Sequence, residues 1–121
     1  IFNITKIVKD MVKKSTINNG LLNLSILHTS CSLMIQENAD PTVMLDIKSF
    51  LKKIAPEGDY FHDTEGRDDM PAHLKSLITQ SNLTISIQNK EMLLGTWQGI
   101  FLIEHRYHPK SRKLFFHILG E

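Results

Sequence analysis

Apolar side chains near the start of the chain recur at the spacing of a helix. Between residues 4 and 12 they are separated mainly by lysines and number five: Ile4, Ile7, Val8, Met11 and Val12. This pattern predicts an amphipathic helix that packs one face on a core, with Asn3 or Thr5 capping its start. The Asn-Asn-Gly step at 18–20 predicts a turn, since Asn and Gly tolerate positive φ.

Two stretches after this turn have the character of strands. Residues 21–27 (LLNLSIL) alternate apolar and polar positions, as a half-buried strand does. Residues 31–37 (CSLMIQE) predict a second strand, and the His-Thr-Ser step at 28–30 lies between the two, at a bend or a strand edge.

A second helix is predicted to begin after Asp40 and to stop at the Pro-Glu-Gly step at 56–58. Asp40 is a suitable cap, and Pro41 is tolerated in the first turn because its missing N–H would have no partner there. We expect the buried face of this helix to consist of Val43, Ile47, Phe50, Leu51 and Ile54.

Residues 57–69 predict a loop that is long and acidic for so small a domain, and such loops tend to be functional or disordered. A short helix is expected from about Pro71 to Ile78, with Asp69 placed to cap it. Its expected apolar face consists of Leu74, Leu77 and Ile78.

Strand patterns dominate the rest of the chain. Strands are predicted at 83–88, 97–105 and 113–119, residues 89–91 turn the chain before 92–95 continue it, and a further turn falls at 107–111. Helix, two strands, two helices and a terminal β-meander indicate an α+β fold, with antiparallel β-sheets packed with about three helices. The length predicts a single domain spanning 1–121.

Composition and charge exclude several classes of protein. The net charge of +1 gives no overall attraction to nucleic acid or to an anionic membrane, and no apolar run approaches the roughly 20 residues that span a bilayer. One cysteine, Cys31, permits no internal disulfide. No leader is visible, although a chain that begins at Ile1 could have been trimmed, and we expect a cytoplasmic protein.

Two histidines bracket the acidic loop and its continuation EGRDDMPAH (65–73). Imidazoles with carboxylates suit zinc or manganese, and carboxylates alone suit magnesium, so His62 and His73 are candidate metal ligands. Their spacing matches no strict metal signature, and a solvated acidic loop that leads into a helix is the alternative.

The position of His73 bears on its protonation. In the second turn of a helix capped by Asp69, the helix dipole disfavours the imidazolium and favours a neutral ligand or base. The same helix start is suited to bind an anion. The alternative is a surface residue paired with Asp69, four positions before it.

Other polar residues support two interpretations each. His28 could be a ligand or a general base, or it could be hydrogen-bonded by Thr29 or Ser30, which its spacing favours. Cys31 is expected to be a small buried residue rather than a nucleophile. Trp97 could stack on a heteroaromatic ring, but the residues alone favour a core position between sheet layers.

His105 stands between Glu104 and Arg106 and predicts a solvated strand end. Glu37 closely follows the apolar run at 33–35, which favours an inward position.

Four motifs in order resemble one family: HTSCSLMIQENADP (28–41), PEGDYFHDTEGRDDMPAH (56–73), NLTISIQ (82–88) and LGTWQGIFLIEHR (94–106). They resemble the YjbQ-like proteins, also called the secondary thiamine-phosphate synthase family, and the likeness covers nearly the whole chain. The resemblance implies a YjbQ-like α+β fold, a homotrimer with pockets near subunit contacts, and a metal near the histidines. The polar signature that it carries over is His28, Thr29, Ser30, Glu37, Asn38, His62, Asp69, His73, Thr96, Trp97, Gln98 and Glu104.

The activity attached to the family joins hydroxymethylpyrimidine diphosphate to thiazole phosphate and releases pyrophosphate. On this hypothesis a magnesium ion held by Asp68, Asp69 or Glu65, with Arg67 or the helix start near Pro71, stabilises the charge of the leaving group. The roles are assigned as follows: catalytic His73, Asp69 and Glu37; substrate-binding Thr29, Ser30, Asn38, Arg67, Thr96, Trp97 and Gln98; metal-binding His28, His62 and His73.

Two further functions stay open. A hydrolase of a small phosphorylated or cyclic substrate would hold zinc or a similar ion through His28, His62 and His73, while Glu37 or Asp69 orients the attacking water. A non-catalytic trimer could instead bind a metal or ligand as a sensor or scavenger.

Overall fold

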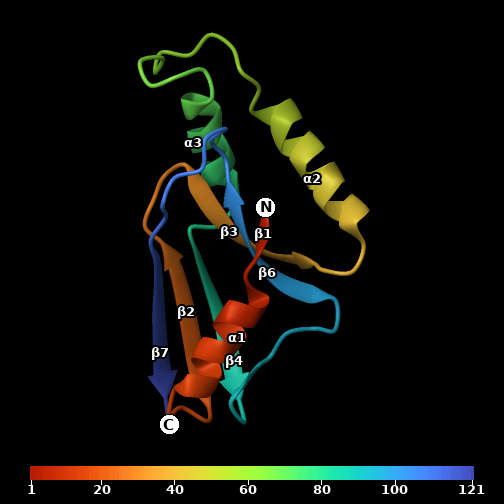
Figure 1. Cartoon of the computed structure of the whole chain (residues 1–121), viewed down its shortest axis with the longest axis vertical. Helices are drawn as coiled ribbons and strands as arrows, with labels where there is room; N and C mark the ends of the chain where they lie inside the picture. Colours follow the sequence, from red (N-terminus) through yellow and green to blue (C-terminus); the bar gives the residue numbers. More distant parts are fainter.

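Two antiparallel sheets and three helices make up the computed structural model, which describes residues 1–121 (Figure 1). The expected α+β fold is confirmed. The elements in chain order are β1 (Phe2–Asn3), α1 (Thr5–Lys14), β2 (Gly20–Ile26), β3 (Cys31–Glu37), α2 (Pro41–Ile54), α3 (Asp69–Ile78), β4 (Asn82–Gln88), β5 (Glu91–Met92), β6 (Gln98–Glu104) and β7 (Leu114–Gly120).

The sheets have a different topology from the predicted terminal meander. One sheet has the strand order β1-β6-β3, and the other has the order β5-β4-β2-β7. Of the C-terminal strands, β4 and β7 therefore flank β2, whereas β6 pairs with β3 in the other sheet. Alternation along one strand sets its buried face but not its partner, which is why the sequence pattern could not distinguish these topologies.

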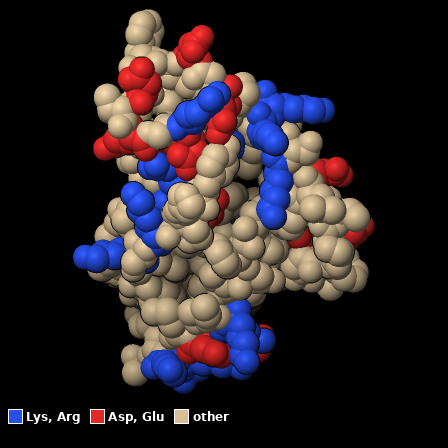
Figure 2. All heavy atoms as spheres, turned by 45° about the horizontal axis from the view of Figure 1, so that its top comes forward, with Lys and Arg blue, Asp and Glu red and all other residues tan.

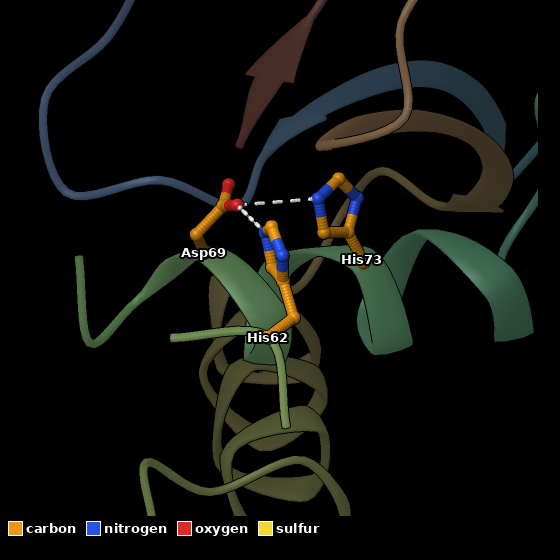
Figure 3. Close-up of side chains that lie close together, drawn as sticks. All are labelled: His62, Asp69 and His73. Atoms are coloured by element: carbon orange, nitrogen blue, oxygen red, sulfur yellow. Dashed lines mark hydrogen bonds and ion pairs between the residues drawn. The ribbon is translucent and has the colours of Figure 1, made fainter. Parts of the chain in front are cut away.

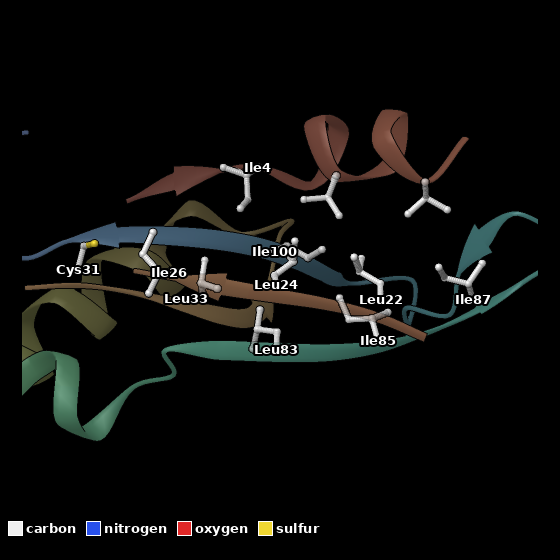
Figure 4. Packing of buried hydrophobic residues seen from close by; sticks show 12 residues of the cluster. Ile4, Leu22, Leu24, Ile26, Cys31, Leu33, Leu83, Ile85, Ile87 and Ile100 are labelled. Carbon is white, nitrogen blue, oxygen red and sulfur yellow. The ribbon is translucent and has the colours of Figure 1, made fainter. Parts of the chain in front are cut away.

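The core lies between α1 and the two sheets (Figure 4). From α1, Val8 and Val12 are almost completely buried, as the helical spacing predicted. The alternation in β2 sends Leu22 and Leu24 inward. Cys31 is fully buried at the start of β3, as expected, and burial raises the pKa of its thiol.

Helix α2 begins as predicted but packs differently. The Asp40 carboxylate accepts a hydrogen bond from the Thr42 N–H at 2.9 Å, and Pro41 occupies the first turn. Of the expected buried face only Leu51 is buried, whereas Phe50 is 58% and Ile54 is 47% exposed. Figure 1 shows α2 standing away from the sheets, which leaves its apolar positions uncovered. Periodicity identifies such a face without showing what covers it.

No helix of the protein combines the length and the apolar character that crossing a membrane requires.

Helix α3 starts two residues earlier than predicted, and this changes the role of Asp69. Asp68 is the residue before the helix, and its side chain makes no capping hydrogen bond. Asp69 is the first helical residue and is buried, so its carboxylate is free to contact other side chains. The expected apolar face is also wrong, because Leu77 is 77% exposed while the smaller Ala72 is buried.

Candidate metal centre

Three side chains meet at the start of α3 (Figure 3). Asp69 and His73 are four residues apart and therefore lie on one side of the helix. His62 comes from the long loop between α2 and α3, which returns to place its ring beside the same carboxylate. Of the expected convergence of His28, His62 and His73 with a loop carboxylate, the structure brings together His62, His73 and Asp69. We call these three residues the histidine cluster.

One carboxylate oxygen contacts both rings. Asp69 Oδ2 lies 2.6 Å from Nε2 of His62 and 3.3 Å from Nε2 of His73. The Asp69 side chain is only 3% exposed, whereas the side chains of His62 and His73 are 41% and 31% exposed. The carboxylate therefore closes the inner side of the cluster, and the two imidazoles border an open outer side.

The backbone at Thr29 determines the tautomer of His73. His73 Nδ1 lies 2.9 Å from the carbonyl oxygen of Thr29, which can only accept a hydrogen bond, so Nδ1 carries the hydrogen. In the neutral ring Nε2 then has a free lone pair directed at the Asp69 carboxylate, itself an acceptor. Metal-binding histidines commonly donate their second N–H to a carbonyl in this way.

Arg106 orients the carboxylate from its other side. Its Nη1 donates to Asp69 Oδ1 at 2.6 Å, its Nε donates to Asp68 Oδ2 at 3.1 Å, and its Nη2 donates to the Glu65 carbonyl at 2.8 Å. Gly66, at φ +112°, makes the turn beside this contact, a conformation that favours glycine. One guanidinium thus fixes both the loop and the direction of Asp69 Oδ2.

The charges of the cluster keep Asp69 ionised. Burial works to raise the pKa of Asp69, but contacts that include the hydrogen bond from His62 and the charge of Arg106 outweigh it and lower that pKa. The same hydrogen bond raises the pKa of His62 above its ordinary value. An ionised carboxylate between two imidazoles is the protonation state that a metal requires of its carboxylate ligand.

The donor set fits a divalent transition metal such as zinc. The ligand atoms of the histidine cluster all lie within 4.8 Å of one another. Ligands about 2.0–2.1 Å from a tetrahedral zinc are themselves about 3.3 Å apart. Two imidazoles, one carboxylate and an open outer side leave room for a water or a substrate. Magnesium fits this set less well, since it prefers oxygen ligands.

The structure does not bring His28 into the histidine cluster. Its Nε2 accepts a hydrogen bond from the Lys113 N–H at 3.1 Å, which gives it a structural partner at the edge of β7. The expected partners Thr29 and Ser30 do not bond to the ring. Of the three histidines expected to converge, two do.

A second group of expected site residues lies at the opposite end of β3. Glu37 pairs in register with Gln98, whereas Cys31 at the other end follows the segment that contacts His73. Seven residues of strand separate these ends by about 20 Å. The second group consists of Glu37, Asn38, Thr96, Trp97 and Gln98.

Hydrogen bonds tie this second group together. Glu37 accepts from the Asp40 N–H, the Asn38 side chain donates to the Gln98 carbonyl, and Gln98 Oε1 accepts from the Gly95 N–H. Trp97 is 62% exposed, so the core position that the sequence favoured is wrong. Its indole is free to contact another molecule.

Sequence reasoning selected Arg67 and missed Arg106. The Arg67 side chain is 84% exposed and reaches only Glu57, at 3.7 Å. Arg106 follows β6, where the residue pattern predicts a solvated strand end, so no local signal identifies it. Glu104 pairs with Arg112, with Nη2 to Oε1 at 2.5 Å, and both side chains are less than 9% exposed. Glu104 therefore has a structural partner outside the cluster.

His105 is buried, contrary to the expected solvated strand end. It is only 6% exposed, and its Nε2 lies 2.8 Å from the Ser32 hydroxyl, which also accepts a hydrogen bond from Thr79. Burial, followed by the charge of Lys75, lowers the pKa of His105 from 6.5 to about 4. The neutral ring is therefore part of the packed structure.

The free energy of unfolding should fall as the pH drops from 6.5 towards 4. In this window the unfolded chain binds a proton at residue 105 and the folded chain does not. The expected loss is about 2 kcal/mol at pH 5 relative to pH 7.5. Urea unfolding at several pH values measures it, with His105→Gln, which keeps an acceptor for Ser32, as the reference.

The difference in pH dependence between the wild type and His105→Gln isolates the contribution of His105. The Asp68 and Asp69 pKa values are lowered from 3.8, so both titrate below the window, and the opposite effect of His62 is common to both proteins. An equal pH slope in the two proteins between pH 6.5 and 4.5 would contradict the assignment.

Comparisons with known proteins find similarity along the whole chain. A family model described as "UPF0047 protein YjbQ-like" matches residues 1–121. The UPF0047 protein sll1880 of Synechocystis sp. is 44% identical over all of this chain and 84% of its own length. The UPF0047 protein YjbQ of Escherichia coli O157:H7 is 42% identical over 96% of this chain and 85% of its own length.

Solved structures give the same result. A YjbQ/UPF0047-family protein from Clostridium acetobutylicum, described as uncharacterized, is 39% identical with a TM-score of 0.89, over 98% of this chain and 89% of that chain. A protein of Sulfolobus solfataricus P2, described as of unknown function, is 26% identical with a TM-score of 0.90, over 99% and 86%.

Proposed function

Because the chain belongs to the UPF0047 family of YjbQ-like proteins, we propose that it is a divalent-metal enzyme acting on a small phosphorylated molecule. Its centre is the histidine cluster. The observation that carries the proposal is the pair of acceptors, Nε2 of His73 and Oδ2 of Asp69, that face each other at 3.3 Å. With a neutral His73, a cation between them replaces the repulsion of two lone pairs by two bonds.

Different residues around the histidine cluster would orient its ligands and leave it open to a substrate. The Thr29 carbonyl holds His73 in the tautomer with a free Nε2, and Arg106 directs one oxygen of Asp69 to the rings. The exposed sides of His62 and His73 leave the approach to the centre open. A divalent ion held there would stabilise the negative charge that develops on a phosphate oxygen or a leaving group.

The resemblance to the secondary thiamine-phosphate synthase family supplies one reaction of this class. Hydroxymethylpyrimidine diphosphate and thiazole phosphate would be joined with release of pyrophosphate. The second candidate is a metal-dependent hydrolase of a small phosphorylated or cyclic substrate. The arrangement of two imidazoles and one carboxylate favours this candidate, because such sets hold zinc firmly and leave a position for water. A metal-binding trimer without turnover is the third.

The homotrimer implied by the resemblance fits two features of the chain. The apolar side chains of α2 are exposed, and contact with another copy would cover them. Trp97 and Gln98 lie at the far end of β3 from the histidine cluster, and a second copy of the chain could bring such an end to the cluster. A solution mass of a single 13.9 kDa chain would exclude this assembly.

Metal content and turnover of the wild-type protein test the proposal. We expect about one equivalent of metal per chain by elemental analysis. Zinc that survives dialysis supports the hydrolase, and magnesium needed only during turnover, with thiamine phosphate and pyrophosphate formed, supports the synthase. Tight metal or ligand binding without turnover of any candidate substrate supports the sensor. A protein that binds no divalent metal and turns over no phosphorylated substrate would refute the proposal.

A further inference from the structure

A cavity of about 590 Å³ opens beside the histidine cluster, between α2, the start of α3 and the end of β6. Leu51, Ala55, Pro71 and Ile103 supply its apolar lining. Its volume is that of a small-molecule site, commonly about 300–1,000 Å³. It shares a wall with the cluster, since Asp68 and Arg106 line the cavity while Arg106 also contacts Asp69.

The carboxylates of the cavity already have partners. Glu57 accepts from the Tyr107 hydroxyl and lies 3.7 Å from Arg67. Asp68 is paired with Arg106, and Glu104 is paired with Arg112. Each acidic residue of the cavity is therefore engaged by another side chain of the protein.

The lysines of the cavity have no such partners. Lys48, Lys52 and Lys75 all line it, and none forms an ion pair or donates a side-chain hydrogen bond. Figure 2 shows lysine and arginine side chains over the α2 side, at the upper right, facing the acidic loop at the upper left. Lys75 is half-buried on α3 and lines the same cavity as Lys52 of α2. A half-buried ammonium beside a like charge is stabilised when an anion joins it.

We propose that this lysine cavity binds the phosphate or diphosphate group of a small molecule, and that its apolar lining takes the organic part. The inference rests on the proposed function, whose substrate carries phosphate, and it adds the place and the residues that recognise that group. Lys52 and Lys75 approach from α2 and α3, so they can clamp the anion from two sides. The shared wall at Arg106 places the bound phosphate next to the metal ligands.

Calorimetric titration of inorganic pyrophosphate into metal-free protein tests the inference. We expect binding by the wild type, a five- to tenfold weaker affinity for Lys52→Met and for Lys75→Met, and recovery in Lys75→Arg. Lys9→Met is the matched control, because Lys9 lies on α1, outside the cavity, and its loss should leave the affinity unchanged. Thermal melts establish whether each variant is folded, and the exposure of Lys52 makes its replacement the less disruptive of the two.

The outcomes separate this inference from the proposed function. A protein that binds pyrophosphate through Lys52 and Lys75 but holds no metal and turns over no substrate would support the cavity and refute the enzyme. Normal metal content and turnover, with pyrophosphate affinity unchanged in both lysine variants, would refute the lysine cavity as the phosphate site but leave the proposed enzyme standing. Equal losses in Lys9→Met and the cavity variants would mean a nonspecific attraction to positive charge, which also overturns it.

Discussion

Replacing Asp69 by asparagine should weaken zinc binding at least about 100-fold while the fold persists. Loss of a residue that merely orients a ligand already costs about 10–100-fold in metal affinity, and Asp69 contacts both histidines directly. The amide keeps an acceptor for Arg106, and its NH₂ group can donate to the free Nε2 of His73. Turnover of any metal-dependent reaction should be lost with the metal.

Competition with a chromophoric chelator measures this affinity. Asp63→Asn is the matched control, because Asp63 is an exposed carboxylate of the same loop and makes no ion pair or hydrogen bond with the cluster. The control should bind zinc as the wild type does. Wild-type affinity in Asp69→Asn would remove Asp69 from the metal centre, and with it the proposed role of the cluster.

Replacing Arg106 by methionine should lower the free energy of unfolding by about 3 kcal/mol. The guanidinium is 16% exposed, and its loss leaves the Asp69 carboxylate, 3% exposed, and the Asp68 carboxylate, 13% exposed, without their cationic partner. The Glu65 carbonyl also loses its donor. An unpaired buried charge costs more than the original pair contributed, so this change should be severe for a single residue.

Urea unfolding with and without zinc measures the effect. Zinc should restore part of the lost stability in Arg106→Met, because a cation at the histidine cluster compensates the charge of Asp69. Arg67→Met is the control: Arg67 is exposed and makes one long contact, so no measurable change is expected. If the two methionine variants were equally stable, Arg106 would not be the residue that holds the acidic loop.

The local features of the centre followed from the sequence. Asp69 and His73 are one helical turn apart, so any helix through them places both on one side. Outside the centre, the cap of α2 was equally local, because it depended only on Asp40 and the adjacent Pro41. His62 was selected as a candidate ligand because of its residue type rather than its spacing, and the structure places it beside Asp69. These inferences required only short-range geometry.

The contacts that complete the centre come from distant segments and left no local signal. Arg106 is 37 residues from Asp69, and Thr29 is 44 residues from His73. His28 was expected in the candidate metal site because of its residue type, but the pairing of β2 with β7 turned it towards the Lys113 backbone. Strand partners are chosen by the whole fold, which also explains the buried His105.

The burial of Cys31 has a practical consequence for experiments on this protein. It is the single thiol of the chain and is shielded from solvent, so thiol reagents should leave the native surface unlabelled. Gly58 lies in the loop that carries His62, and a side chain added there meets no atom within 4 Å. A cysteine introduced at that position would give one attachment point for a fluorophore, whose fluorescence would report motion of the loop near the histidine cluster.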